Sequence, residues 1–373
     1  RQRARMFAGS LLNTSVREVA GKDAGQLAAV LASSETVALP LCKGRVYRCG
    51  AEVLSLTLGE LLQMGYALSD SRLLEDAPEA SVLQEHVLLG RCPAGRWHLG
   101  VAVAEEQAKA FGEALEAMLK AAGGEQRLSQ SSVRGLLAVP TVSLRHGIAE
   151  ASAHEGAYHS MAVVGQAHAL LDWRSVNRFC PACGAATVPI EGGVKVTCAR
   201  DSCRYRGYPR LDPVVIMAVY STDGGSCLVG RQRGYPPGMY TLLSGFVDQG
   251  ESIVEAVVRE VREEGNVAVD AASVRVISSQ PWPIGRAQSN QLMIGCVARA
   301  LSDDVAPNLA EMEDVKWVTI EALRAAHERT NAATTPLGTG GDPAAMTARG
   351  ELWVPPRYAL ANRIIEQLLA DHE

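Results

Sequence analysis

Cysteines are concentrated in one short stretch in the middle of the chain. They form two pairs, with two residues inside the first and four inside the second: Cys180, Cys183, Cys198 and Cys203. Zinc prefers four soft ligands at the corners of a tetrahedron, and two such pairs on two turns can supply them. Gly184 follows the first pair, where a tight turn needs a residue that tolerates positive φ. We therefore expect one structural zinc ion per chain. Two unrelated thiol pairs or a redox-active Cys-x-x-Cys motif are the alternatives.

Acidic side chains form a second group, in the segment 245–267. Helical spacing places Glu260, Glu263 and Glu264 within an arc of roughly 100°, beside an apolar face. That face is made by Ile253, Val254, Val257, Val258 and Val261. Neighbouring carboxylates repel one another, and Mg²⁺ or Mn²⁺, which prefer oxygen ligands, would remove this repulsion. A solvated acidic face of an ordinary helix is the alternative.

The ends of this helix follow from the residues around it. A turn at Gly250 should begin it, with Glu251 in the first turn, where an acid is favourable to the helix dipole. Arg259 lies one turn from both Glu255 and Glu263, so we expect it to orient a carboxylate by a charge-assisted hydrogen bond.

Composition and charge exclude several classes of protein. The chain has 373 residues, 47% of them apolar and 21% charged, as in ordinary globular proteins of two or three domains. No apolar stretch reaches the roughly 18 residues that a membrane-spanning helix needs. The net charge is −5, whereas proteins that wrap nucleic acid are normally basic. The nine cysteines, an odd number, suit a reducing compartment better than a secreted disulfide framework.

Apolar periodicity predicts an α+β framework around these motifs. In the first half we expect two hairpins and two helices, at 37–48, 86–103, 102–122 and 149–173. After the cysteines we expect six strands, at 214–220, 227–230, 241–247, 274–277, 292–299 and 315–318. Helices are expected at 251–264, 321–329 and 357–370, and a long loop at 330–350. The strands of the second half should form a mixed sheet flanked by helices.

The acidic segment resembles the Nudix box, in which a Gly, five residues, a Glu and seven residues precede Arg-Glu-apolar-x-Glu-Glu-x-Gly-apolar. Eight of the nine fixed positions are met in register, by Gly245, Glu251, Arg259, Glu260, Val261, Glu263, Glu264 and Val267. The ninth, the second Gly of the box, is Asn266. Asn is the usual second choice for a left-handed backbone at a helix C-terminus, so we expect the loop geometry to be kept.

Two flanking features narrow the resemblance to the NADH pyrophosphatase (NAD⁺ diphosphatase) family, especially its eukaryotic peroxisomal-type members. They are the Cys₄ element before the box and the sequence SQPWP at 279–283. Behind Pro283 the chain departs from the family pattern, because the next segment is four residues longer. The resemblance implies an α+β fold of three domains. They are a degenerate Nudix-like α/β domain over 1–175, a Cys₄ zinc ribbon over 176–209 and a catalytic Nudix domain over 210–373.

The resemblance further implies metal-dependent hydrolysis of the pyrophosphate bond of NADH or NAD⁺, giving nicotinamide mononucleotide and AMP. The implied catalytic residues are Glu260, Glu263 and Glu264, with Glu263 either a ligand or the base that takes the proton of water. The implied ligands of Mg²⁺ or Mn²⁺ are Ser244, Glu260, Glu263, Glu264 and Glu311. Glu311 could instead be one acid of an acidic surface loop. The implied substrate contacts are Tyr208, Phe246, Gln280, Ser289 and Ala361; a core role is the alternative for Phe246.

Other functions remain open at this point. The same site could cleave NAD-capped RNA, ADP-ribose or another nucleoside diphosphate derivative. A catalytically silent zinc-ribbon module that binds nucleotide or RNA is an alternative of another class, and a basic strip on the ribbon leaves RNA contact open. The resemblance implies a homodimer with a dinucleotide substrate and no membrane partner. We expect an intracellular protein, cytoplasmic or organellar. The family resemblance relates it to the peroxisome, but the chain ends in Asp-His-Glu and not in a Ser-Lys-Leu-type signal. Its first 20 residues include four Arg and resemble a transit peptide only weakly.

Overall fold

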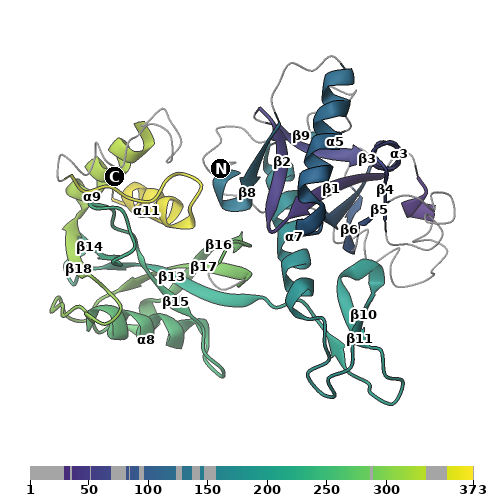
Figure 1. Ribbon diagram of the computed structural model, residues 1–373. Helices are drawn as coiled ribbons and strands as arrows, with labels where there is room; N and C mark the ends of the chain where they lie inside the picture. The colour runs from purple at the N-terminus through teal and green to yellow at the C-terminus, as the bar shows by residue number, and fades with distance from the viewer. Residues whose placement is uncertain are drawn as a thin grey trace. The chain divides into compact units, whose positions relative to one another are not determined.

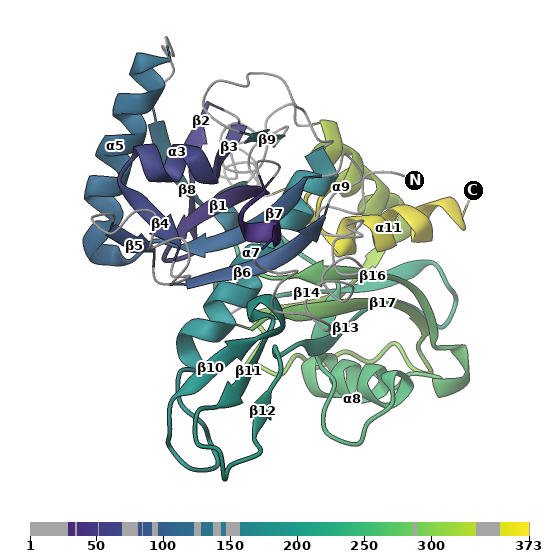
Figure 2. The same cartoon turned by 90° about the vertical axis from the view of Figure 1, so that its right-hand side faces the viewer.

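The structure is a computed structural model that consists of two compact units, each described here by itself (Figures 1 and 2). The N-terminal unit contains residues 7–210 and 283–290, and the C-terminal unit contains mainly residues 211–282 and 291–373. The described residues are 29–33, 36–50, 52–68, 81–83, 85–91, 96–122, 128–136, 143–146, 157–285, 289–332 and 351–372. Among them, no helix has both the length and the apolar character needed to span a membrane.

The N-terminal unit is built on a mixed sheet with the strand order β6-β7-β1-β2-β3-β9. β1 (Thr36–Cys42) pairs antiparallel with β2 (Arg45–Cys49), and β6 (Glu85–Arg91) with β7 (Trp97–Ala102), so both predicted hairpins are confirmed. The long predicted helix is α7 (Ala157–Val176), which packs against β1, β6 and β7. The other elements are β3 (Glu52–Thr57), α3 (Leu58–Gln63), β4 (Tyr66–Leu68), β5 (Ser81–Leu83), α5 (Ala108–Ala121), β8 (Leu128–Ser132), α6 (Val133–Leu136) and β9 (Ser143–His146).

A small antiparallel sheet follows α7. It contains β10 (Thr187–Ile190), β11 (Lys195–Cys198) and β12 (Arg206–Gly207). A turn at Gly192 and Gly193 joins β10 to β11, and both glycines have positive φ, 69° and 88°. We refer to residues 176–210 as the ribbon.

The C-terminal unit has a mixed sheet in the order β16-β17-β13-β14-β18, with β15 also paired to β13. The central strand β13 (Asp212–Tyr220) is apolar and buried from Val214 to Val219, because helices cover both of its faces. Val215, Met217 and Val219 face α8, whereas Ile216 and Ala218 face the layer of α9 and α11. Figure 1 shows α8 below this sheet and α9 and α11 above it. The elements are β14 (Ser226–Arg231), β15 (Leu243–Phe246), α8 (Ile253–Gly265), β16 (Arg275–Trp282), β17 (Gln291–Arg299), β18 (Asp314–Thr319), α9 (Ile320–Ala332) and α11 (Leu360–Ala370).

The two units share one topology. In each, a central strand, β1 or β13, pairs in parallel with a later strand, β7 or β17, and antiparallel with a nearer one, β3 or β15. A helix follows the nearer strand, and a late helix, α7 or α11, contacts the central strand, its parallel partner and the strand beyond that partner, β6 or β16. The helix after β3 is only six residues long, whereas α8 has 13.

Three sequence expectations were wrong in detail. The acidic helix begins at Ile253 and not at Glu251, because Ser252 caps it. The last helix begins at Leu360 and not at 357. The side-chain oxygen of Gln280, in β16, accepts a hydrogen bond from the Leu360 N–H and so caps the helix there. The helix predicted over 102–122 is α5, which begins only at Ala108, because β7 ends at Ala102 and a 3-10 turn precedes the helix. Most of the predicted loop at 330–350 lies outside the described residues, but its first residues belong to α9.

Candidate metal and pyrophosphate site

The site is organised by the connection from β15 to α8. Ser252 accepts a hydrogen bond from the backbone N–H of Glu255, and the Glu255 carboxylate accepts one from the N–H of Ser252. This capping box fixes the first turn of α8, so Glu255 takes the first-turn position that was expected for Glu251. Glu251 lies before the helix, where its carboxylate accepts the N–H of Asp248 at 3.0 Å.

Arg259 ties this connection to the acidic face of α8. Its guanidinium binds both carboxylate oxygens of Glu251, at 2.6 and 2.8 Å, and donates to the Phe246 carbonyl at 2.8 Å. One nitrogen, Nη1, also contacts Glu260 at 2.8 Å and Glu263 at 2.9 Å. The hydrogen bonds from Arg259 lower the pKa of Glu251 to about 2, so this pair is charged throughout the physiological range. Arg259 therefore orients carboxylates as expected, but its partners include Glu251 and not Glu255.

Glu260 and Glu264 lie on the buried side of α8, against the backbone of β15. A Cβ atom at Gly245 would overlap the Glu260 carboxyl group, so a larger residue there would force this carboxyl group to move. The backbone N–H of Ser244 donates to Glu264 Oε2 at 3.3 Å. The side chain of Glu263 is half exposed and turns toward Arg259 instead. Two of the three box glutamates are thus held at the β15 backbone, beside Ser244.

Burial makes the ionised forms of these two glutamates costly. It is the main cause of the raised pKa of Glu264, about 8, and the charges of Glu260 and Glu311 add to it. The pKa of Glu260 is also raised, first by burial, although the Arg259 charge opposes this. A cation at these oxygens would favour the ionised carboxylates and offset the cost.

A loop from 301 to 313 closes the C-terminal end of α8. The backbone N–H groups of Ala306 and Asn308 donate to the carbonyls of Gly265 and Glu264, both at 3.0 Å. This loop carries Glu311, whose side chain is exposed but close enough to raise the pKa of both buried glutamates. Asn266 ends the helix with φ 58°, the left-handed conformation expected for the altered box position.

The expected substrate contacts lie in several places. Phe246 ends β15 with 48% of its surface exposed, so it is not a core residue. Gln280 is buried, and its amide binds the backbone at the start of α11. The amide nitrogen donates to the Tyr358 carbonyl, and the amide oxygen accepts a hydrogen bond from the Leu360 N–H. Ala361 is buried in the α11 core layer. Tyr208, 59% exposed, and Ser289 belong to the N-terminal unit.

The four predicted cysteines come together in the ribbon, with all four sulfurs within 4.8 Å of one another. In the described part of the chain they are the one group of three or more His, Cys, Asp or Glu residues that meets this spacing. The backbone N–H of Ala185 and the thiol of Cys198 lower the pKa of Cys183 to about 7, which favours the thiolate that a metal requires. Gly184 has φ 72°, as the knuckle turn predicted. Four thiols at this spacing fit zinc.

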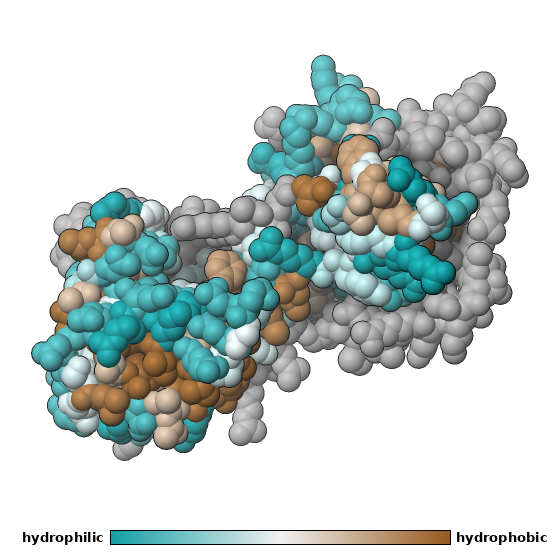
Figure 3. Space-filling model, turned by 90° about the horizontal axis from the view of Figure 1, so that it is seen from below, coloured by the Kyte–Doolittle hydropathy of each residue, from teal (hydrophilic) through white to brown (hydrophobic). Residues whose placement is uncertain are grey.

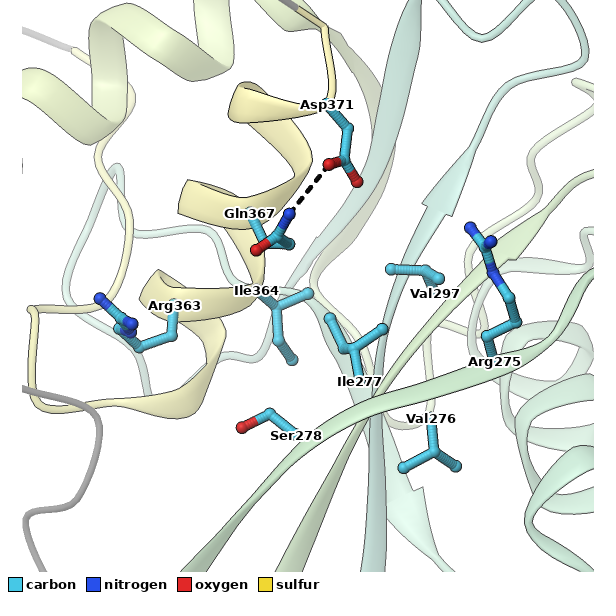
Figure 4. Close-up of a pocket in the computed structure, with 9 residues that line it drawn as sticks. All are labelled: Arg275, Val276, Ile277, Ser278, Val297, Arg363, Ile364, Gln367 and Asp371. Atoms are coloured by element: carbon cyan, nitrogen blue, oxygen red, sulfur yellow. Dashed lines mark hydrogen bonds between the residues drawn. The ribbon is translucent and has the colours of Figure 1, made fainter. Parts of the chain in front are cut away.

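A cavity of about 490 Å³ opens elsewhere in the C-terminal unit, between β16 and α11 (Figure 4). Figure 4 shows Val276, Ile277 and Ile364 between two arginines, Arg275 and Arg363, but no residue of α8. It is therefore separate from the carboxylates. Seen from below, the C-terminal unit presents a broad hydrophilic band beside a hydrophobic patch (Figure 3).

Sequence reasoning missed the residues that hold the loop of Glu311. Arg231 forms an ion pair with Glu313 at 3.0 Å, and Arg233 donates to the Leu309 carbonyl at 2.8 Å. No periodic signal marks such contacts, because their partners are more than 70 residues away in the sequence. The acidic composition of residues 311–314 is the sequence feature from which basic partners for this loop could have been predicted.

Two family comparisons match this part of the chain. Residues 176–208 match the NADH pyrophosphatase zinc ribbon domain, and residues 210–337 match the NUDIX domain. The first match and the four thiols indicate zinc, and the second implies a divalent cation at the acidic site. The residues fit such a cation, because two buried carboxylates with raised pKa values lie beside further oxygen donors.

Curated relatives resemble the same region. The chain is 40% identical over 210 residues to NAD-capped RNA hydrolase NUDT12 of Homo sapiens, covering 55% of this chain and 40% of that protein. It is 32% identical over 207 residues to NAD(P)H pyrophosphatase NUDT13, mitochondrial, of Homo sapiens, covering 55% and 54%. It is 36% identical over 168 residues to NAD-capped RNA hydrolase NudC of Pseudomonas aeruginosa, covering 45% and 57%. The matched region thus spans about half the length of these relatives.

Proposed function

The chain belongs to the NADH pyrophosphatase family of Nudix proteins, and from this premise we propose that it hydrolyses the pyrophosphate bond of NADH or NAD⁺. Water adds across the P–O–P bond, and the products are nicotinamide mononucleotide and AMP. The observation that carries the proposal is the pair of buried carboxylates, Glu260 and Glu264, held against the backbone of Ser244 and Gly245.

We propose that Glu260, Glu263, Glu264, Glu311 and the Ser244 carbonyl hold Mg²⁺ or Mn²⁺. When bound, such a cation neutralises charge on the two phosphates and lowers the pKa of an attacking water. Arg259 supports this arrangement, because its ion pairs with Glu260 and Glu263 limit the positions of both side chains. Glu263 is the most exposed of the three box glutamates, so it can either complete the ligand set or accept the proton of the water.

The substrate contacts are also part of the proposal. Phe246 offers an exposed ring at the end of β15, and Tyr208 offers an exposed ring in the N-terminal unit, so each could stack on a base. Gln280 and Ala361 shape the protein beneath the substrate, because both are buried at the start of α11. Ser289 is proposed on the family resemblance alone.

A second candidate function is cleavage of NAD-capped RNA by the same site. Two of the relatives carry that activity in their names, and the ribbon has the charge that RNA would need. ADP-ribose is a third candidate substrate.

We further propose that residues 1–175 form a degenerate Nudix-like domain, because their sheet repeats the C-terminal topology. We also propose that the chain is an intracellular homodimer.

Product analysis tests the proposal directly. The full chain is incubated with NADH, NAD⁺, ADP-ribose and NAD-capped RNA, each with Mg²⁺ or Mn²⁺, and the products are separated by chromatography. We expect nicotinamide mononucleotide and AMP from NADH in the presence of a divalent cation, and no products without one. Unchanged dinucleotides with both metals would contradict the proposed function.

A further inference from the structure

One face of the ribbon sheet is exposed and carries a row of side chains across all three strands. The register pairs Val188 with Thr197 and Thr197 with Arg206, so these three residues share a face. The residues that alternate with them, Val196 and Cys198, are buried on the opposite face. The zinc site therefore occupies one side of the sheet and leaves the other side accessible.

A second row extends the same face. Ile190 pairs with Lys195, and the Lys195 ammonium lies 5.3 Å from the ring centroid of Tyr208. Tyr208 is 59% exposed and Val188 45% exposed. The Lys195 ammonium also pairs with Glu191 at 2.8 Å, whereas Arg206 is exposed. The face thus offers an aromatic ring, an aliphatic surface and the Arg206 guanidinium, which is the combination that stacks bases and contacts phosphates.

The ribbon also differs in charge from the rest of the chain. Residues 176–210 contain six basic and two acidic residues, a net charge of +4, although the whole chain has a net charge of −5. Arg200, Arg204 and Arg206 are exposed, and no ion pair neutralises their side chains within the part of the chain that the structure describes. Such a local excess of positive charge favours a polyanion.

We propose that this face binds the RNA body of an NAD-capped RNA, an inference that rests on the proposed function. The dinucleotide carries only two phosphates, which the box cations neutralise, whereas RNA adds one phosphate for each further nucleotide. Tyr208 is proposed to hold a base of the cap and belongs to the same face. On this face, Arg206 contacts phosphates of the strand and Val188 contacts its bases.

Charge reversal on this face tests the inference. Arg206→Glu is compared with Lys109→Glu, a matched control whose side chain is 90% exposed on α5. For each full-length variant, kcat/KM is measured with NADH and with an NAD-capped RNA. For Arg206→Glu we expect roughly a tenfold fall with the capped RNA, a salt dependence shallower than that of the wild type, and an unchanged value with NADH. Lys109→Glu should resemble the wild type with both substrates.

Binding measurements separate this inference from the proposed function. Fluorescence anisotropy with a labelled NAD-capped RNA, without added divalent cation, reports binding even if the wild type cleaves nothing. Equal RNA affinity in the wild type and in Arg206→Glu overturns the inference, and NADH cleavage then still decides the proposed function. A parallel fall with both substrates also overturns it.

Two further outcomes are decisive. If Arg206→Glu changes the oligomeric state in light scattering, the face is a contact between copies of the chain and the inference is wrong. If this variant loses its zinc, Val188→Glu replaces it, because Val188 lies in the same exposed row and is not a ligand. Loss of capped-RNA binding in zinc-loaded Val188→Glu supports the inference, and wild-type binding overturns it.

Discussion

At the scale of single residues, the backbone of β15 restricts the acidic site as strongly as the glutamates themselves. Gly245 leaves just enough room for the Glu260 carboxyl group, and the N–H of Ser244 faces Glu264. A preorganised pair of carboxylates loses little side-chain freedom when a cation binds, which favours binding. The glycine therefore has a functional role, although it carries no side chain.

Gly245→Ala should remove most of the activity while leaving the fold intact. The new Cβ atom would displace the Glu260 carboxyl group, so we expect kcat/KM for NADH to fall by roughly a hundredfold. Gly234→Ala is the matched control, because a Cβ atom there meets nothing within 4 Å. Steady-state kinetics and circular dichroism on both variants provide the check. Full activity in Gly245→Ala would mean that the position of Glu260 is unimportant.

The buried glutamates also predict a pH dependence of stability. The pKa of Glu264 is about 8 in the folded protein, against an ordinary value of 4.5, so the folded state binds this proton more tightly than the unfolded state. Without added divalent cation, the melting temperature should therefore fall as the pH rises from about 4.5 to about 8, and Mg²⁺ should reverse the fall. Glu264→Gln should flatten this dependence. Thermal melts in chelator-free buffers keep the zinc in place, and a melting temperature that rises over this interval in the wild type would contradict the assignment.

At the scale of elements, local patterns predicted what local forces determine. The continuous apolar run of β13 and the apolar stripe of α8 predicted the right elements, because each pattern depends on residues that are close in the sequence. The partner Glu251 of Arg259, the cap that Gln280 provides for Leu360 and the loop that carries Glu311 all depend on long-range contacts. Sequence spacing cannot predict these contacts. It therefore predicts where the cysteines and the box glutamates lie, but not which residues hold them in position.

The C-terminus of α8 gives a prediction for this scale. Asn266 has φ 58°, a conformation that glycine adopts without the steric cost of a Cβ atom. Asn266→Gly should therefore raise the free energy of unfolding by about 0.5 kcal/mol, whereas Asn266→Ala should lower it by about 1 kcal/mol. Urea unfolding of the three proteins measures both changes. Equal stability of the Gly and Ala variants would show that the left-handed conformation is not retained in solution.

At the scale of the whole molecule, one topology occurs twice with different chemistry. In the C-terminal unit, the helix after the nearer strand is α8, with Glu260, Glu263 and Glu264. In the N-terminal unit the corresponding helix is α3, and its one acid, Glu60, closes a capping box with Thr57. A single carboxylate, already used in the cap of its own helix, does not replace the group of three that α8 carries. Of the described residues, those of α3 therefore include no group of carboxylates comparable with that of α8.

This difference predicts that a single substitution in α8 removes nearly all of the hydrolytic activity of the chain. Glu264→Gln keeps the shape of the side chain but removes the charge, so hydrolysis of NADH should fall by roughly a hundredfold or more. Because α3 offers no second set of carboxylates, no component with a different KM should remain. Activity is measured over a wide range of NADH concentrations, with zinc content as the control for an intact ribbon. A residual phase with its own KM would place a second active site in the N-terminal unit and contradict the assignment of catalysis to α8 alone.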